Sequence, residues 1–452
     1  MTDRTEHVGQ AQRDVIPFRA AVRTWFVISL QTFGGPAGQI AVMQRHLVEE
    51  RRWIGQRRFL HALNYCMLLP GPEAQQLAIY VGWLLNGLRG GLVAGTLFVL
   101  PGMVALLVLS AIYVGFGDTT VVTAVFAGLA PAVVAIVAQA VWRVGKRALT
   151  SRTLVAFAVV AALALAVFGV PFPIVVAAAA LAGWALIRPR DTEPDEDDGP
   201  APLIADDTLH DDRPSGHRAL AILAVGLLAW FVPVAVVVAA TGIGSVYSQQ
   251  GVFFSGTAVV TFGGAYAVLA FVAQRAVEHY GWLSAGDMVR GLALAETTPG
   301  PLIMVVQFVA FLGAYHHPGP LDPWLAGVVA SLLTTWVTFV PCFLFVLVGA
   351  PYVERLRGNR ALSAALTGIT AAVVGVIANL GLYFALHTLF REVEDGPLAL
   401  QVPDLATVRW TPVVIAAVAA VLIFRFRWPV LRVLGACAAL GLLAGLAGLP
   451  GV

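Results

Sequence analysis

Four short motifs combine glycine and proline within apolar segments and could together bind an anion. They are Phe33-Gly34-Gly35-Pro36, Leu69-Pro70-Gly71-Pro72, Phe262-Gly263-Gly264 and Thr298-Pro299-Gly300-Pro301. Proline removes a backbone donor and clashes with the preceding turn, so such motifs predict interrupted helices. A helix that restarts after a break presents free N–H groups and about half a positive charge, which suits an anion. For single glycines, close helix packing is the alternative explanation.

Polar side chains accompany these breaks. Glu73 follows Pro72, and Glu296 lies just before Pro299. Ionisable groups at membrane depth are costly and usually functional, so both acids are candidates for proton coupling. Glu73 could instead cap the restarted helix. Gln39, Gln75 and Gln76 could donate hydrogen bonds to an oxyanion or bond to neighbouring helices.

The elements that hold these motifs must lie in a membrane. Only 12% of the 452 residues are charged and 59% are hydrophobic, whereas soluble chains carry about 25% charged residues. Uncharged runs such as 90–117 and 323–352 exceed the roughly 20 residues that cross a bilayer. We therefore expect an all-α polytopic membrane protein in contact with membrane lipids, without nucleic-acid partners, metals or cofactors.

The chain contains an internal repeat. Residues 32–72 match 261–301 at an offset of 229, with 12 of 41 positions identical. An insertion around His316 and His317 then changes the offset to 240, which aligns Gly128 with Gly368. Self-similarity on this scale indicates two homologous halves.

An acidic segment separates the halves. Residues 188–218 hold ten acidic residues and five prolines, a composition typical of a disordered linker. The predicted organisation is a cytoplasmic N-terminal segment 1–23, a first membrane repeat 24–187, the cytoplasmic linker 188–218, a connecting transmembrane helix 219–241 and a second membrane repeat 242–452.

Charge bias indicates that the halves are inverted. Residues 45–58 carry five Arg against two Glu, whereas the equivalent 274–287 carries one Arg against two acids. The basic loop 142–152 has an acidic counterpart in 382–409, and 351–360 has three Arg where 111–120 has none. Because cytoplasmic loops are enriched in Arg and Lys, equivalent loops lie on opposite sides of the membrane. The basic residues of 45–58 could attract anions or simply anchor this topology.

The spans follow from that topology. The motif segments 24–44, 59–88, 251–273 and 288–314 are predicted to be broken, re-entrant helical hairpins that return to the same side. The predicted crossings are 91–113, 121–142, 153–169, 171–187, 219–241, 323–350, 363–388, 410–424 and 433–450.

The motif residues resemble the chromate transporter (CHR) family. The similarity lies in Phe33-Gly-Gly-Pro36, Glu49-Glu-Arg-Arg-Trp-Ile54, Leu69-Pro-Gly-Pro-Glu-Ala-Gln-Gln-Leu77 and the run 90–102. The second half resembles the second domain of the long, two-domain members. The resemblance implies chromate export, and also handling of sulfate, in the prokaryotic inner membrane. The halves are unequal, since Ala265 and Leu302 replace Pro36 and Glu73.

We therefore expect a secondary active transporter, not an enzyme, that binds its oxyanion at the facing breaks and works by alternating access. A sulfate or other oxyanion transporter of the same fold is the first alternative, and the sequence is also compatible with a passive channel. The oligomeric state is open, and a homo-oligomer is compatible with the sequence. A membrane enzyme acting on lipid phosphates would need clustered His or Asp ligands or a nucleophile, and the sequence offers none.

Overall fold

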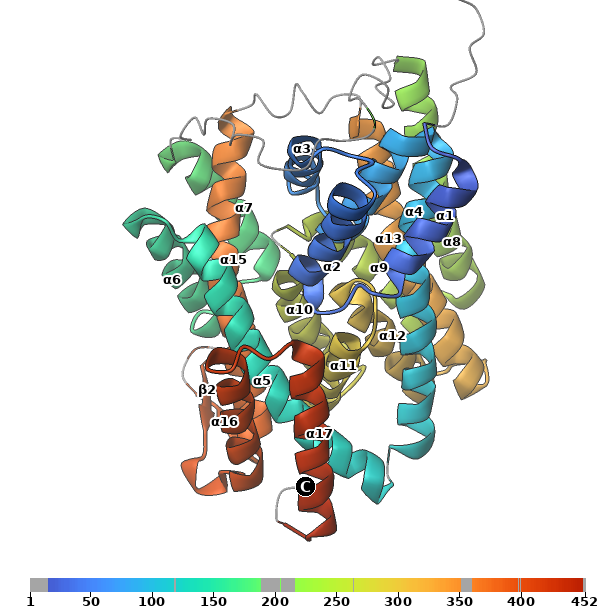
Figure 1. Cartoon of the computed structure of the whole chain (residues 1–452). Coiled ribbons are helices and arrows are strands. Elements are labelled where there is room, and N and C mark those ends of the chain that lie inside the picture. The colour runs from blue at the N-terminus through green and yellow to red at the C-terminus, as the bar shows by residue number, and fades with distance from the viewer. Residues whose placement is uncertain are drawn as a thin grey trace, which may run out of the picture.

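The computed structural model describes residues 15–117, 119–187, 204, 216–262, 264–350, 360–396, 398 and 400–449. The described chain is almost entirely helical, with one small antiparallel hairpin of β1 and β2 (Figure 1). In chain order the elements are α1 (Phe18–Ser29), α2 (Gly35–Gln44), η1 (Arg45–Glu50), α3 (Gln56–Cys66), α4 (Glu73–Phe116), α5 (Thr120–Ala148), α6 (Arg152–Ala166), α7 (Phe172–Leu186), α8 (Gly216–Thr241), α9 (Val246–Val260), α10 (Ala265–Gln274), η3 (Arg275–His279), α11 (Ala285–Thr297), η4 (Leu302–Met304), α12 (Val305–His316), α13 (Pro323–Gly349), α15 (Arg360–Leu389), β1 (Val393–Asp395), β2 (Gln401–Pro403), η6 (Leu405–Thr407), α16 (Trp410–Phe424) and α17 (Val430–Leu446).

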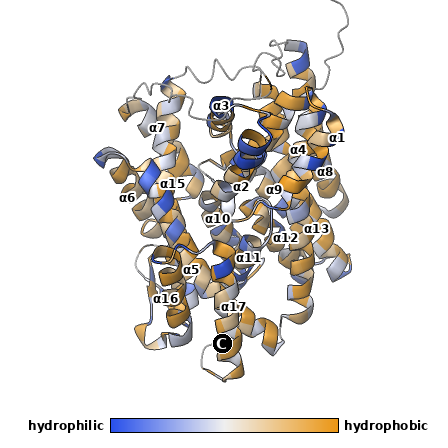
Figure 2. Ribbon diagram, in the orientation of Figure 1, coloured by the Kyte–Doolittle hydropathy of each residue, from blue (hydrophilic) through white to orange (hydrophobic). Residues whose placement is uncertain are grey.

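The helices have the surface of a membrane protein. Among the described residues, α4, α5, α8, α13 and α15 are long and apolar enough to cross a bilayer. Large apolar side chains such as Val225 and Leu228 on α8 are more than 60% exposed, which fits contact with lipid. Figure 2 shows most helices coloured as hydrophobic along their length. The prediction of an all-α polytopic membrane protein is confirmed.

Helix positions follow the sequence repeat. At the offset of 229, α1, α2 and α3 correspond to α9, α10 and α11, and both halves place a π-helix, η1 or η3, directly after α2 or α10. The long helix α4 is kinked at Asn86 and Gly87, where Gly87 has φ +58°. It therefore corresponds to α12 plus α13. Helix α5 matches α15, the α6–α7 pair matches α16–α17, and α8 is the extra connecting helix.

The two halves exchange their last helices. α5 packs against α16 and α17 of the other half, and α15 packs against α6 and α7. Close approaches occur at repeat-related positions: a Cβ on Gly128 would lie 2.0 Å from the Cys437 carbonyl oxygen, and one on Gly368 would lie 2.5 Å from that of Ala179. Small residues thus allow the backbones to touch, as in other membrane helix pairs.

Equivalent elements lie at opposite ends of the molecule. In Figure 1, α3, α6 and α7 occupy the upper part, whereas α11, α16 and α17 occupy the lower part. This placement is the one expected for inverted halves, and their orientation across the membrane remains a prediction. Segment 1–14, Gly263, Arg357 and the linker apart from 204 and 216–218 lie outside the described residues.

Several crossings differ by a few residues from their predicted bounds, and the difference at the end of α5 bears on the site. The crossing predicted at 121–142 extends to Ala148, so most of the supposed loop 142–152 is helical. Lys146 and Arg147 lie in the last turn of α5, where cations interact favourably with the negative end of the helix dipole. This extension changes the surroundings of the basic side chains.

Candidate functional site

The four predicted breaks are all seen between helices among the described residues. Residues 30–34, 67–72, 298–301 and the described part of 261–264 are outside α-helices. Helix α2 starts after Gly34, whose φ is +81°, and α10 starts after Gly264, whose φ is +100°. Because L side chains rarely adopt such φ values, glycine permits these sharp entries.

Backbone hydrogen bonds between the breaks tie the two halves together. The N–H of Gly71 donates to the Thr261 carbonyl at 2.8 Å, and the N–H of Gly300 donates to the Thr32 carbonyl at 2.9 Å. These two bonds are equivalent under the repeat. Gln39 adds a third link, because its Nε2 donates to the Gly300 carbonyl at 2.5 Å. Each Pro-Gly-Pro break therefore pairs with the Thr-Phe-Gly-Gly break of the opposite half, which satisfies backbone groups that would be costly to leave unpaired in a membrane.

A cavity of about 310 Å³ lies beside these links, and we call it the inner cavity. The N-terminal ends of α2 and α10 both reach it, so two positive helix ends face one space. Apart from its apolar side chains, its lining comes from α4, α5, α11, α15 and the N-terminal ends of α2 and α10: Gly34, Gly35, Pro36, Glu73, Gln139, Arg143, Arg147, Gly264, Tyr266, Glu296 and Thr370.

Helix α5 brings positive charge to the inner cavity. Gln139, Arg143 and Arg147 recur every four residues, which places them on one face of the helix. Both guanidinium side chains are exposed. Within the described part of the chain neither makes an ion pair. Lys146, by contrast, does not line the cavity, and its Nζ lies 5.7 Å from the centre of the Trp142 ring.

The two acids occupy different positions at the same cavity. Glu296 is only 3% exposed and accepts a 2.5 Å hydrogen bond from the Tyr266 hydroxyl. Arg143 is close enough to interact electrostatically with both of these residues. Glu73 lies in the first turn of α4, where a negative charge interacts favourably with the helix dipole.

The residues predicted from the sequence to form the site fall into two groups, those that line the inner cavity and those that do not. Six of them line the inner cavity: Gly34, Gly35, Pro36, Glu73, Gly264 and Glu296. The other described candidates lie outside it: Phe33, Gln39, Pro70, Gly71, Pro72, Gln75, Gln76, Thr298, Pro299, Gly300 and Pro301.

Neither glutamine after the first Pro-Gly-Pro motif lines the inner cavity. Gln76 Nε2 donates to the Pro70 carbonyl at 2.7 Å. Gln75 is fully buried, and its amide has no hydrogen-bond partner among the described residues.

Five polar residues of the cavity were not nominated from the sequence: Gln139, Arg143, Arg147, Tyr266 and Thr370. The two arginines were assigned to a loop that anchors topology. Their spacing of four from Gln139 was the available signal, since it continues one helical face past residue 142.

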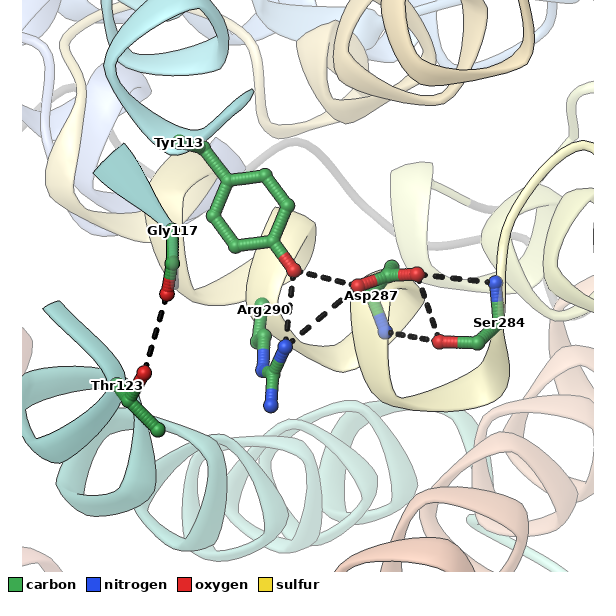
Figure 3. A network of polar contacts seen from close by, with 6 residues as sticks. All are labelled: Tyr113, Gly117, Thr123, Ser284, Asp287 and Arg290. Atoms are coloured by element: carbon green, nitrogen blue, oxygen red, sulfur yellow. Dashed lines mark hydrogen bonds and ion pairs between the residues drawn. The ribbon is translucent and has the colours of Figure 1, made fainter. Parts of the chain in front are cut away.

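A second polar network joins the halves away from the inner cavity. The Tyr113 hydroxyl donates to Asp287 Oδ1 at 2.5 Å and accepts from Arg290 Nη1 at 2.9 Å (Figure 3). Asp287 also forms a capping box with Ser284 at the start of α11. The network therefore fixes the start of α11 to the C-terminal part of α4, while the end of α11 carries Glu296 to the cavity.

These features define a multi-pass membrane protein whose repeated halves enclose a cavity lined by arginines and glutamates. The chromate transporter family model matches residues 19–184 and 248–442, one region in each half. The chain belongs to the chromate transporter family. In bacteria such a multi-pass protein lies in the inner membrane.

Two named relatives match most of the chain. A chromate transport protein of Pseudomonas aeruginosa is 34% identical over 359 residues, which are 77% of this chain and 76% of the relative. A chromate transport protein of Cupriavidus metallidurans is 28% identical over 388 residues, 81% of this chain and 82% of that one. These relatives are named as transport proteins and not as enzymes. No solved structure matches the chain.

Proposed function

We propose that this chain is a secondary active transporter that exports chromate from the cytoplasm and binds the oxyanion in the inner cavity. The observation that carries the proposal is the convergence of Arg143, Arg147 and the N-terminal ends of α2 and α10 on one cavity. Two guanidinium groups balance the charge of a dianion, and each can donate two parallel hydrogen bonds to its oxygens. The names of the relatives supply chromate as the substrate.

The direction follows from the predicted topology. The cavity extends to Arg147 and Ala148 at the C-terminal end of α5, which the charge pattern places on the cytoplasmic side. An oxyanion would therefore enter from the cytoplasm. Rocking of one inverted half against the other around the Gly71–Thr261 and Gly300–Thr32 bonds would open the opposite side, which is alternating access.

Glu296 is the proposed coupling residue. When ionised, it competes with the oxyanion for Arg143, so its protonation state and oxyanion binding are linked. Glu73 lines the same cavity, but the positive end of α4 stabilises its charge. We assign Glu73 a smaller part in coupling.

Labelled chromate uptake into inverted vesicles tests the proposal. We expect uptake that depends on the protein, responds to an imposed proton gradient and is competed by unlabelled chromate. Sulfate is a tetrahedral dianion of similar size, so it is the alternative substrate. Uptake equal to that of vesicles without the protein would refute chromate transport, and stronger competition by sulfate than by chromate would assign sulfate as the substrate.

A further inference from the structure

A second cavity, of about 520 Å³, lies elsewhere in the fold and is not part of the site described above. We call it the outer cavity. Its polar lining comes from α15, the end of α10, η3 and β2: Gln274, Glu278, Asn379, Tyr383, His387 and Gln401. Leu165, Ala166 and Phe172, at the α6–α7 connection, complete one wall.

One wall of the outer cavity is the repeat counterpart of a wall of the inner one. At the offset of 240, Asn379, Tyr383 and His387 on α15 correspond to Gln139, Arg143 and Arg147 on α5. Phe172 at the start of α7 corresponds to Val430 at the start of α17, and each lines its own cavity. The two cavities thus share one repeat-related wall, the face of α5 or α15 with the start of α17 or α7, and the predicted inversion puts the second cavity at the outer face.

The two cavities differ in charge. Tyr383 and His387 occupy the positions of the two arginines, so among the described residues Glu278 shares its lining with no arginine or lysine, whereas Glu73 and Glu296 share the inner cavity with two arginines. His387 donates from Nδ1 to the Tyr383 carbonyl oxygen at 2.9 Å, so a neutral ring turns the acceptor Nε2 to its surroundings. The nearby Arg290 and Arg409 line a separate pocket of about 80 Å³ together with His387. Arg290 lies 3.6 Å from the Asp287 carboxylate.

The outer cavity also has a cover that the inner one lacks. The segment between α15 and α16 contains the β1–β2 hairpin, whereas only residues 149–151 separate α5 from α6. Val393, Leu400 and Gln401 of the hairpin segment line the outer cavity. The insertion is therefore part of the cavity wall.

We infer that the outer cavity is the exit vestibule for the same tetrahedral oxyanion, a weak-binding counterpart of the inner cavity in which Tyr383 and His387 replace the two arginines. The inference rests on the proposed function. Both cavities are lined by carboxylates, but only the inner one has guanidinium groups to offset them, so an oxyanion binds more weakly in the outer cavity. Unequal affinities do not supply energy, but they set the concentrations at which each face binds and releases the ion.

Adding a cation to the outer cavity tests the inference. The variant is His387→Arg, and the measurement is labelled chromate efflux from right-side-out vesicles with unlabelled chromate in the bath. One added charge-assisted hydrogen bond is expected to lower the bath concentration that half-inhibits efflux by about tenfold. The internal chromate concentration that half-saturates efflux should not change. Gln401→Arg, on the hairpin, adds a cation without altering a helix and should shift inhibition in the same direction.

The matched control is His316→Arg, the same substitution at an exposed position on the same predicted face but in neither cavity. An equal shift in this control would overturn the inference, because surface charge alone would explain it. No shift in either outer-cavity variant, while Arg143→Gln weakens internal binding, would refute the exit vestibule and leave the proposed function intact. If Arg143→Gln also leaves internal binding unchanged, the proposed site itself fails.

Discussion

Replacing Arg143 with Gln tests whether the inner cavity binds the oxyanion. Arg143 lines the cavity, is exposed and makes no ion pair within the described part of the chain, so its charge is available to a ligand. A hydrogen bond to a charged group contributes about 1.5–3 kcal/mol. Its loss should therefore weaken chromate binding roughly 10- to 150-fold. The chromate affinity of Arg143→Lys should lie between those of the unchanged protein and Arg143→Gln, because lysine keeps the charge but not the planar guanidinium group.

Equilibrium binding of labelled chromate to purified protein measures this effect. Lys146→Gln is the control, since it removes the same charge about one helical turn from Arg143. The Lys146 side chain lies over the Trp142 ring and does not line the cavity. We expect its affinity to change by less than about twofold, as for a screened surface charge. Equal losses in the two variants would show that the general charge of this helix end attracts the anion, and the reasoning about the cavity would be wrong.

Three further predictions concern the breaks, the acids and the topology. Gly34→Leu and Gly242→Leu impose the same backbone strain, since φ is +81° and +80° and neither added Cβ meets an atom within 4 Å. Only Gly34→Leu should abolish chromate flux at normal expression, and an equal loss of flux in both variants would mean that strain alone is responsible. Glu296→Gln should abolish flux driven by a proton gradient and preserve chromate binding, because the amide still accepts a hydrogen bond from Tyr266. Glu73→Gln should leave the pH dependence of flux unchanged. Chromate flux measured against pH decides this, and unchanged gradient-driven flux in Glu296→Gln would remove that residue from coupling. Cysteines at positions 51 and 357 should be protected from an impermeant reagent in whole cells, and one at 394 should react; the opposite labelling of 51 and 394 would contradict the inverted topology.

Much of the helical framework could be predicted from the sequence, because apolar runs and the repeat determine it locally. The shared offsets even anticipated that Gly128 and Gly368 are equivalent, and the structure shows both as sites of close helix approach. Gly-Pro motifs likewise predicted where helices stop, since the backbone effect of these residues depends on few neighbours.

The site was harder to predict, because it depends on which breaks meet. Nothing in the local sequence shows that Gly71 and Gly300 donate to Thr261 and Thr32 of the opposite half. Their N–H groups were therefore expected to face an anion. Assigning Arg143 to a loop had a related cause, since charged residues usually end a membrane span but here continue the helix.

Locating bound chromate directly tests the central claim that the inner cavity holds the oxyanion. Crystals of the protein grown with chromate, measured at the chromium absorption edge, would give an anomalous peak at the metal of the ion. We predict one strong peak between the N-terminal ends of α2 and α10, within hydrogen-bonding reach of the Arg143 guanidinium. A peak at the Pro-Gly-Pro breaks or in the outer cavity, with none in the inner cavity, would contradict the account.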